Sequence, residues 1–203
     1  MPVLAGVDGC REGWVVASDA GAEVLPTFAH IQARGFDLVL IDVPIGLLED
    51  AARRCDVEAR SLIGARRSSV FPAPSRSLLR ATQYAGQCSR QLWNILYKIR
   101  EVDAGIAPEL QERVREAHPE VSFALLNGKP LHFPKRRPEG EEERRRLLRP
   151  LFGELPSLPG AARDDVLDAY VLLWSARRLA RGDARVLGSG ERDARGLRCE
   201  IVG

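Results

Sequence analysis

Residues 36–44, "FDLVLIDVP", point to the fold class of this chain. Residues 38–41 are apolar without interruption, which favours a strand buried on both faces over a strand with one face in water. Strands of this kind lie in sheets that helices cover on both sides, so the segment predicts an α/β architecture. The run ends at Asp42, a carboxylate flanked by apolar residues with no basic residue close to it in the sequence.

Three shorter strands are expected before this segment. Residues 2–9 ("PVLAGVDG"), 13–19 ("GWVVASD") and 22–29 ("AEVLPTFA") are apolar runs separated by tight polar turns, a pattern typical of an antiparallel meander. Pro26 cannot donate a main-chain hydrogen bond, so we expect the third strand to lie at the edge of the sheet or to end there.

The chain after residue 44 is mainly helical in pattern, with serine or proline at several expected helix starts. Helices are expected at residues 51–64, 75–86, 89–103 and 108–117, then a strand at 119–126, a charged helix at 140–152, a helix at 163–180 and an edge strand at 197–203. This order predicts one domain over residues 1–203, with a mixed α/β sheet and a helical insertion at about residues 48–117, after the fourth strand.

The composition is that of a folded domain with a preference for arginine. Hydrophobic residues make up 45% of the 203 residues and charged residues 29%, which are ordinary values for a globular protein. Only three of the 30 basic residues are lysine. The planar guanidinium of arginine suits bidentate binding of phosphate, although a codon bias of the source genome would give the same excess.

Membrane and secreted classes are not expected. No apolar run approaches the roughly 18 residues that span a membrane, and the first ten residues do not resemble a signal peptide. The four cysteines are too far apart in sequence for a zinc knuckle or a redox pair. We therefore expect a cytoplasmic protein with reduced thiols and no membrane partner. The sequence does not define the oligomeric state, and a homodimer is one option.

A cluster of aspartates opens the helix expected at residues 163–180, "RDDVLDAYVLLWSARRLA". Asp164 and Asp165 lie in the first turn, where the helix dipole favours acids, so each could serve as a cap. Asp168 lies one turn further in, on a face that it shares with apolar residues. Carboxylates clustered near a core repel each other, so they hold either protons or a cation. We favour a divalent cation.

Two further aspartates are expected at strand ends. Asp8 and Asp42 each follow an apolar run, and ligand sites of α/β sheets gather at the carboxyl ends of strands. If the two strands are parallel neighbours, these carboxylates stand side by side. The alternative is that each begins a turn, which is the more usual explanation for the Asp8–Gly9 pair.

These acids define a candidate catalytic centre. Oxygen ligands suit Mg²⁺ and Mn²⁺, and two such ions can stabilise the attacking and leaving oxygens of a phosphoryl displacement. We expect Asp8, Asp42, Asp165 and Asp168 to be both metal ligands and catalytic residues, with Glu120 as a fifth catalytic acid. His118 could position a water or a phosphate, or it could simply bond a carbonyl at a helix end.

A basic loop and one helix supply candidate substrate contacts. The loop at residues 64–76, "GARRSSVFPAPSR", carries arginines and serines of the kind that contact phosphate, although it could also be a structural loop with a solvated rim. In the helix at residues 89–103, Trp93 and Tyr97 could stack on bases or pack in the core. The expected substrate-binding residues are Arg66, Arg67, Ser68, Ser69, Arg76, Lys98 and His118.

Several stretches of the chain together resemble one known family. They are "GVDGCREGWVVA", "IDVPIGL", "RRCDVEAR", "RRSSVFPAPSR", "QLWNILYKIREVD", "EAHPEVSF" and "DDVLDA". They resemble, in order and over nearly the whole chain, the motifs of the bacterial and archaeal domain-of-unknown-function family 429. That family is described as a predicted nuclease with an RNase H-like fold.

The resemblance implies a five-stranded mixed sheet flanked by helices, with the first strand central and paired with the fourth. By that pattern Asp8 matches the first-strand acid and Asp42 the fourth-strand acid. Asp165 and Asp168 match the pair of aspartates three residues apart on the last helix of the Holliday-junction resolvase branch, and Asp164 is an extra acid. Two departures are Glu12, where the family often has glycine, and the absence of the first-helix acid of true ribonuclease H from "HIQARG".

Three functions follow as hypotheses. The first is a metal-dependent nuclease that uses Mg²⁺ or Mn²⁺ and acts on nucleic acid as its partner. The second is a phosphotransferase of the sugar-kinase and actin type, which shares the core fold but normally cradles phosphate with Gly- and Ser/Thr-rich hairpins that "DGCREGW" does not provide. The third is a nucleic-acid-binding module of the same fold without catalysis.

Overall fold

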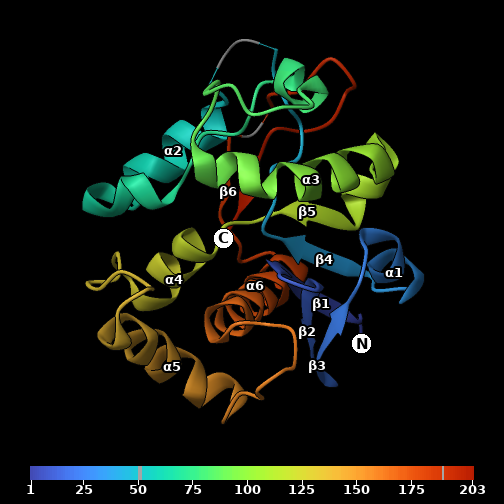
Figure 1. The fold of residues 1–203 in the computed structure, drawn as a ribbon. Helices are drawn as coiled ribbons and strands as arrows, with labels where there is room; N and C mark the ends of the chain where they lie inside the picture. The colour runs from blue at the N-terminus through green and yellow to red at the C-terminus, as the bar shows by residue number, and fades with distance from the viewer. Residues whose placement is uncertain (50–51, 189) are drawn as a thin grey trace.

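The computed structural model describes residues 1–49, 52–188 and 190–203. Its centre is a mixed sheet of five strands in the order β3-β2-β1-β4-β5 (Figure 1). The strands are β1 (Leu4–Cys10), β2 (Gly13–Ser18), β3 (Gly21–Leu25), β4 (Leu38–Ile41) and β5 (Val114–Glu116). The meander β1-β2-β3 is antiparallel, whereas β1 pairs with β4 and β4 with β5 in parallel. The expected α/β sheet, with its first strand central and paired with its fourth, is confirmed.

Helices cover both faces of the sheet, as the uninterrupted apolar run of β4 predicted (Figure 1). Leu38 and Leu40 pack in one core with α6 (Arg163–Arg181), while Val39 and Ile41 pack in a second core with α3 (Arg90–Gly105). The first core also contains residues of α4 (Pro119–Asn127) and α5 (Pro138–Phe152), and the second contains residues of α1 (Phe28–Ala33). Alternate side chains of β4 therefore pack against helices on opposite faces of the sheet.

The insertion between β4 and β5 differs in detail from its expected form. It contains α2 (Arg54–Leu62), short 3₁₀ segments and α3. The helix expected at residues 75–86 is only a 3₁₀ turn, η2 (Arg76–Arg80), and the first residue of the helix expected at 51–64 lies outside the described residues. The helical segments end at η3 (Pro108–Glu112), so the insertion is shorter than the predicted residues 48–117.

The fifth strand was predicted in the wrong place. The helix expected at residues 108–117 is wrong, since its second half is β5, which pairs with β4 through Ile41 and Glu116. The open edge of β4 supplies hydrogen-bond partners that override the helical pattern of this short segment. The strand expected at residues 119–126 is also wrong. It is α4, which begins at Pro119, a favoured first helical residue, and ends at Gly128 in the left-handed conformation.

The C-terminal strand exists but is short. β7 (Ile201–Val202) pairs with β6 (Val186–Leu187) in a two-stranded sheet, and a single parallel bridge from Val202 to Ala117 links it to the chain just after β5, the edge strand of the main sheet. Among the residues that the structure describes, no helix combines the length and apolar character that crossing a membrane requires. Cys10, Cys55, Cys88 and Cys199 are free thiols.

The contact between β1 and α6 depends on Gly6. A Cβ at this position would lie 2.1 Å from Ala169 O and 2.1 Å from Leu173 N, both main-chain atoms of α6. We predict that Gly6→Ala lowers the free energy of unfolding by about 3 kcal/mol or more, because the helix must move off the sheet. Urea denaturation measures the loss.

Gly35→Ala is the control. It measures the cost of placing alanine at a positive φ where no steric clash occurs. A Cβ there meets nothing within 4 Å, but φ is +70°. The expected cost is about 1–2 kcal/mol. Equal losses in the two variants would contradict the close packing of α6 on β1.

Candidate active site

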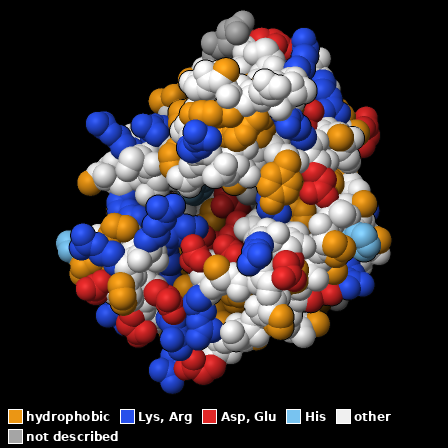
Figure 2. Space-filling model, in the orientation of Figure 1, with side chains coloured by type: hydrophobic (Ala, Val, Ile, Leu, Met, Phe, Trp, Pro, Cys, Tyr) orange, Lys and Arg blue, Asp and Glu red, His pale blue; other side chains and the backbone are white. Residues whose placement is uncertain are grey.

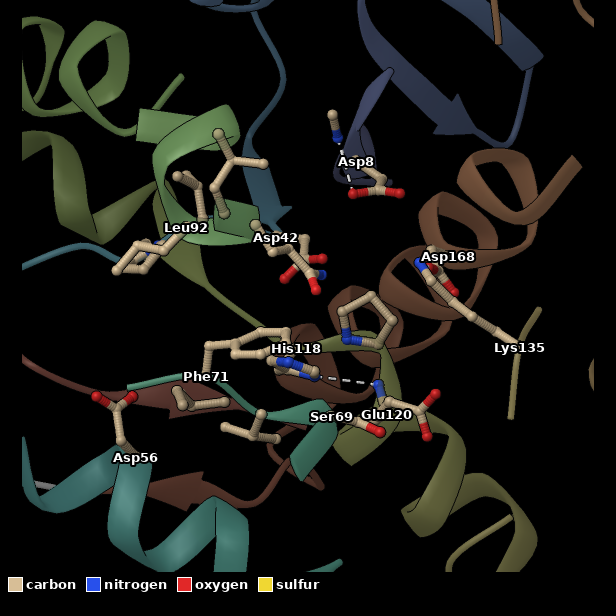
Figure 3. Close-up of a pocket in the computed structure, with 18 of the residues that line it drawn as sticks. Asp8, Asp42, Asp56, Ser69, Phe71, Leu92, His118, Glu120, Lys135 and Asp168 are labelled. Atoms are coloured by element: carbon tan, nitrogen blue, oxygen red, sulfur yellow. Dashed lines mark hydrogen bonds and ion pairs between the residues drawn. The ribbon is translucent and has the colours of Figure 1, made fainter. Parts of the chain in front are cut away.

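Parallel pairing places Asp8 and Asp42 beside each other, each directly after the last pair of the β1–β4 ladder, although β1 itself continues to Cys10. Val7 pairs with Ile41, and the N–H of Asp42 donates to Val7 O at 2.9 Å. The ladder thus continues to the residue before Asp8. The Asp8 carboxylate is buried and accepts the N–H of Gly9 at 2.8 Å. Asp8 does not begin a turn, because β1 continues to Cys10 and Asp8 pairs with Val15 of β2. Both side chains lie at one cavity (Figure 3).

The start of α6 brings two more aspartates to this cavity. Asp168 is buried and Asp165 is half-buried, and both line it together with Asp8 and Asp42. Asp165 Oδ2 accepts the N–H of Ala162 at 2.9 Å, which is the capping contact considered from sequence. The cavity has a volume of about 400 Å³, and Figure 2 shows acidic side chains in the hollow, with basic ones near it. The four predicted aspartates therefore converge.

Burial and mutual repulsion dominate the electrostatics of this acid centre, by which we mean Asp8, Asp42, Asp165 and Asp168. Burial raises the pKa of Asp8 well above its usual value, and the charges of Asp42 and Asp168 raise it further. Burial also raises the pKa of Asp165, and it raises that of Asp168 to about 6. Carboxylates held together in this way bind protons or a cation more readily than exposed ones.

Lys135 is a cation at the acid centre that sequence analysis did not identify. Its Nζ lies 2.8 Å from Asp168 Oδ2 and 3.4 Å from Asp164 Oδ2 (Figure 3). The contact with Asp168 is the main cause that raises the pKa of the lysine. Lys135 follows Pro134 in an irregular segment without periodicity, so the only signal in the sequence was its rarity among many arginines.

The donor set fits Mg²⁺ or Mn²⁺ in its chemistry. It consists of carboxylate oxygens, with more negative charge than one ammonium neutralises. Within residues 1–49, 52–188 and 190–203, no group of three His, Cys, Asp or Glu side chains stands ready in coordinating geometry. Binding an ion would therefore require the aspartates to close together and Lys135 to leave Asp168.

The third parallel strand also ends in an acid, Glu116, but this one is already neutralised. Arg53, which is 2% exposed, donates to both carboxylate oxygens of Glu116 at 2.7 Å and to both of Asp56 at 2.7 and 3.1 Å. Burial raises the pKa of Glu116, and the guanidinium opposes this. Because β5 was not predicted, sequence analysis missed Glu116 as a strand-end acid.

Glu120 and His118 line the cavity but have other partners. Glu120 Oε1 accepts hydrogen bonds from Arg66 at 3.2 Å and from the buried Arg144. His118 Nδ1 accepts the N–H of Glu120 at 3.2 Å and so caps α4. The capping partner is a main-chain N–H rather than the expected carbonyl. In the neutral ring this contact leaves the proton on Nε2 as a donor.

The predicted substrate-binding residues separate into two groups. Arg66, Ser68, Ser69, Lys98 and His118 line the cavity, whereas Arg67 and Arg76 do not. Arg76 binds Asp103 and Asp193 within the fold, and Arg67 is exposed elsewhere on the loop.

Lys98 and Arg136 both line the cavity, but they differ in whether other groups of the protein already bind their charge. Lys98 is buried, and its Nζ donates to Gly13 O and lies 4.3 Å from the centroid of the Trp14 ring, so the fold already uses this ammonium. Arg136 lines the cavity, is exposed and, within the described part of the chain, makes no ion pair. Sequence analysis did not single it out.

Comparison with known proteins gives one match. The model of a family described as "Protein of unknown function (DUF429)" matches residues 6–192. No curated protein and no solved structure matches the chain.

The Arg53 cluster can be tested through stability. We predict that Arg53→Met lowers the free energy of unfolding by about 3–5 kcal/mol, because it leaves Glu116 and Asp56 buried without a counter-charge. Arg54→Met is the matched control, since the exposed pair of Arg54 with Glu58 should contribute less than about 1 kcal/mol. Denaturation in urea measures both. Similar losses would show that the buried pairing does not stabilise the fold.

The acid centre should destabilise the protein at neutral and higher pH in the absence of divalent ions. Raised pKa values mean that the folded state binds protons more tightly than the unfolded state, so the stability from protonation is lost as the pH rises through about 6. We predict that Asp8→Asn raises the free energy of unfolding at pH 8 by about 0.5–2 kcal/mol.

This gain should shrink as the pH falls through about 6, where Asp168 becomes protonated in the wild type and no longer repels Asp8. Thermal unfolding in a chelator, from pH 5 to pH 8, measures the dependence. Asp19→Asn, at an exposed pair with Arg177, is the control and should change little. A loss of stability in Asp8→Asn at pH 8 would contradict the repulsion.

Proposed function

We propose that this chain, which belongs to the family described as DUF429, is a metal-dependent nuclease that hydrolyses phosphodiester bonds. The convergence of Asp8, Asp42, Asp165 and Asp168 at one cavity carries the proposal. Their spacing in sequence spans most of the chain, and a structural role does not account for like charges gathered at a cost in stability. The strand order and directions are also those that the RNase H-like resemblance implies.

The aspartates would hold Mg²⁺ or Mn²⁺. Such an ion supplies Lewis acidity and a bound water of lowered pKa. Asp8 and Asp42 are fixed by the β1–β4 ladder, and Asp165 and Asp168 by α6, so the chain presents these oxygens from rigid elements. The buried setting strengthens their interaction with positive charge.

Other side chains would position the phosphate. The Nε2–H of His118 is available as a neutral donor because Nδ1 caps α4. Arg136 offers an exposed guanidinium at the cavity, and Ser68 and Ser69 add hydroxyl groups. Lys135, once released from Asp168, would remain near enough to bind a phosphate oxygen. In this scheme Glu120 holds Arg66 and Arg144 in place rather than reacting.

The test combines cleavage with ion binding. Wild-type protein should cleave at least one single-stranded, double-stranded or branched DNA or RNA when Mg²⁺ or Mn²⁺ is added, and Mn²⁺ should raise its melting temperature. Asp42→Asn should lower the cleavage rate by about 100-fold or more and remove the Mn²⁺ shift. Asp19→Asn, outside the site, should retain both.

Two outcomes would overturn the proposal. The first is no cleavage of any substrate together with no Mn²⁺ shift, which would favour a binding module without catalysis. The second is a stabilising shift with ATP and phosphate transfer from it, which would favour a phosphotransferase.

A further inference from the structure

The cavity beside the acid centre has an apolar wall. The proposed role of the aspartates in catalysis does not explain this wall. Phe71 and Ile95 line it, and each is 39% exposed, an unusual exposure for large apolar side chains in this protein. Leu92 lies one helical turn before Ile95 on α3, completes the wall and is half-buried. Figure 3 shows Leu92 and Phe71 across the cavity from Asp8 and Asp168.

The size of the cavity restricts what can lie against this wall. A volume of about 400 Å³ is in the range of sites for small organic molecules. It would accommodate a base with its sugar and phosphate, but not a stretch of double helix, whose major groove alone is about 12 Å wide.

Polar side chains surround the apolar wall, and they match the polar groups of a nucleotide, which lie on its base edge, sugar and phosphate. The Gln91 amide lies beside Leu92 on α3 and makes no hydrogen bond with the described part of the chain. Ser69 and His118 lie across the cavity from Leu92 of α3 (Figure 3), and Arg136, which follows Lys135 in sequence, also lines the cavity. An amide can bind the edge of a base, and hydroxyl and guanidinium groups bind sugar and phosphate.

From this arrangement we infer that the cavity binds one unpaired nucleotide of a nucleic-acid strand, with its phosphate toward the acid centre and its base against Phe71, Leu92 and Ile95. The inference rests on the proposed function, since it names the substrate class of the same site. A base within a duplex is stacked and paired, so its flat face cannot reach the wall, whereas an unpaired base offers that face to apolar side chains.

Binding without cleavage tests the inference. The probes are a ten-nucleotide DNA strand with one 2-aminopurine, the same strand annealed to its full complement, and adenosine monophosphate. Calcium replaces magnesium because it takes the same oxygen ligands. The fluorescence of 2-aminopurine should rise as the base leaves its neighbours and enters the cavity, and the single strand should bind at least about 10-fold more tightly than the duplex.

Phe71→Ala should weaken single-strand binding by about 5- to 100-fold, the range measured for stacking of one base on an aromatic side chain. Phe71→Leu, which keeps an apolar side chain, should fall between the wild type and Phe71→Ala. Leu151→Ala is the matched control, since Leu151 is 40% exposed on α5 and does not line the cavity. It should leave binding unchanged, and circular dichroism should confirm that all three variants are folded.

The outcomes distinguish this inference from the proposed function. Strand binding that depends on Phe71, without cleavage of any substrate, would support the inference and contradict the nuclease. Metal-dependent cleavage of duplex at the same rate in Phe71→Ala as in the wild type would support the nuclease and overturn the inference. Equal affinity for strand and duplex, or for strand and adenosine monophosphate, would also overturn it.

Discussion

The parallel pairing of β1 with β4 is the constraint on which the rest of this structure depends. Because Val7 pairs with Ile41 and the N–H of Asp42 extends the ladder, Asp8 and Asp42, 34 positions apart in the chain, lie beside each other at the carboxyl end of the β1–β4 ladder. In another register the carboxylates of Asp8 and Asp42 would not lie beside each other. The helix α6 adds the third element by packing on Gly6, where the absence of a side chain lets its backbone approach β1. Register and close packing together therefore create the acid centre.

The molecule treats its buried acids in two ways. Glu116 and Glu120 are matched by Arg53, Arg66 and Arg144, whose guanidinium groups compensate for the loss of hydration. The aspartates of the acid centre have less compensation, since the ammonium of Lys135 contacts only Asp168 among them. Burial, together with repulsion from neighbouring carboxylates, raises the pKa values of Asp8, Asp165 and Asp168. Burial also raises the pKa of Glu116, to about 7, so the two groups differ in their counter-charges and not in the direction of the pKa shift. In the proposed nuclease, the negative charge that remains at the acid centre is what would bind the divalent ion.

The sequence was informative where local pattern and tertiary structure agree. The meander, β4 and α6 follow from apolar runs and turns, and the convergence of the four aspartates followed from strand ends and the family resemblance. The segments at residues 108–117 and 119–126 were misassigned because runs this short fit either helix or strand. Pairing with β4 made part of the first segment a strand, whereas Pro119 at the first helical position favours a helix in the second. The pairing of Lys135 with Asp168 and that of Arg53 with Glu116 could not be predicted, since these contacts join segments that only the folded chain brings together.

Lys135 gives the acid centre a positive charge that belongs to the protein itself. Lys135 offsets part of the charge of Asp168 and Asp164 before any ion arrives. If the proposed metal site exists, its ion would add to a charge balance that the folded chain already has in part, unlike the metal of small domains whose site provides most of their folding energy. Under the proposed function, a change in the ion supply would then alter the number of active molecules more than the number of folded ones.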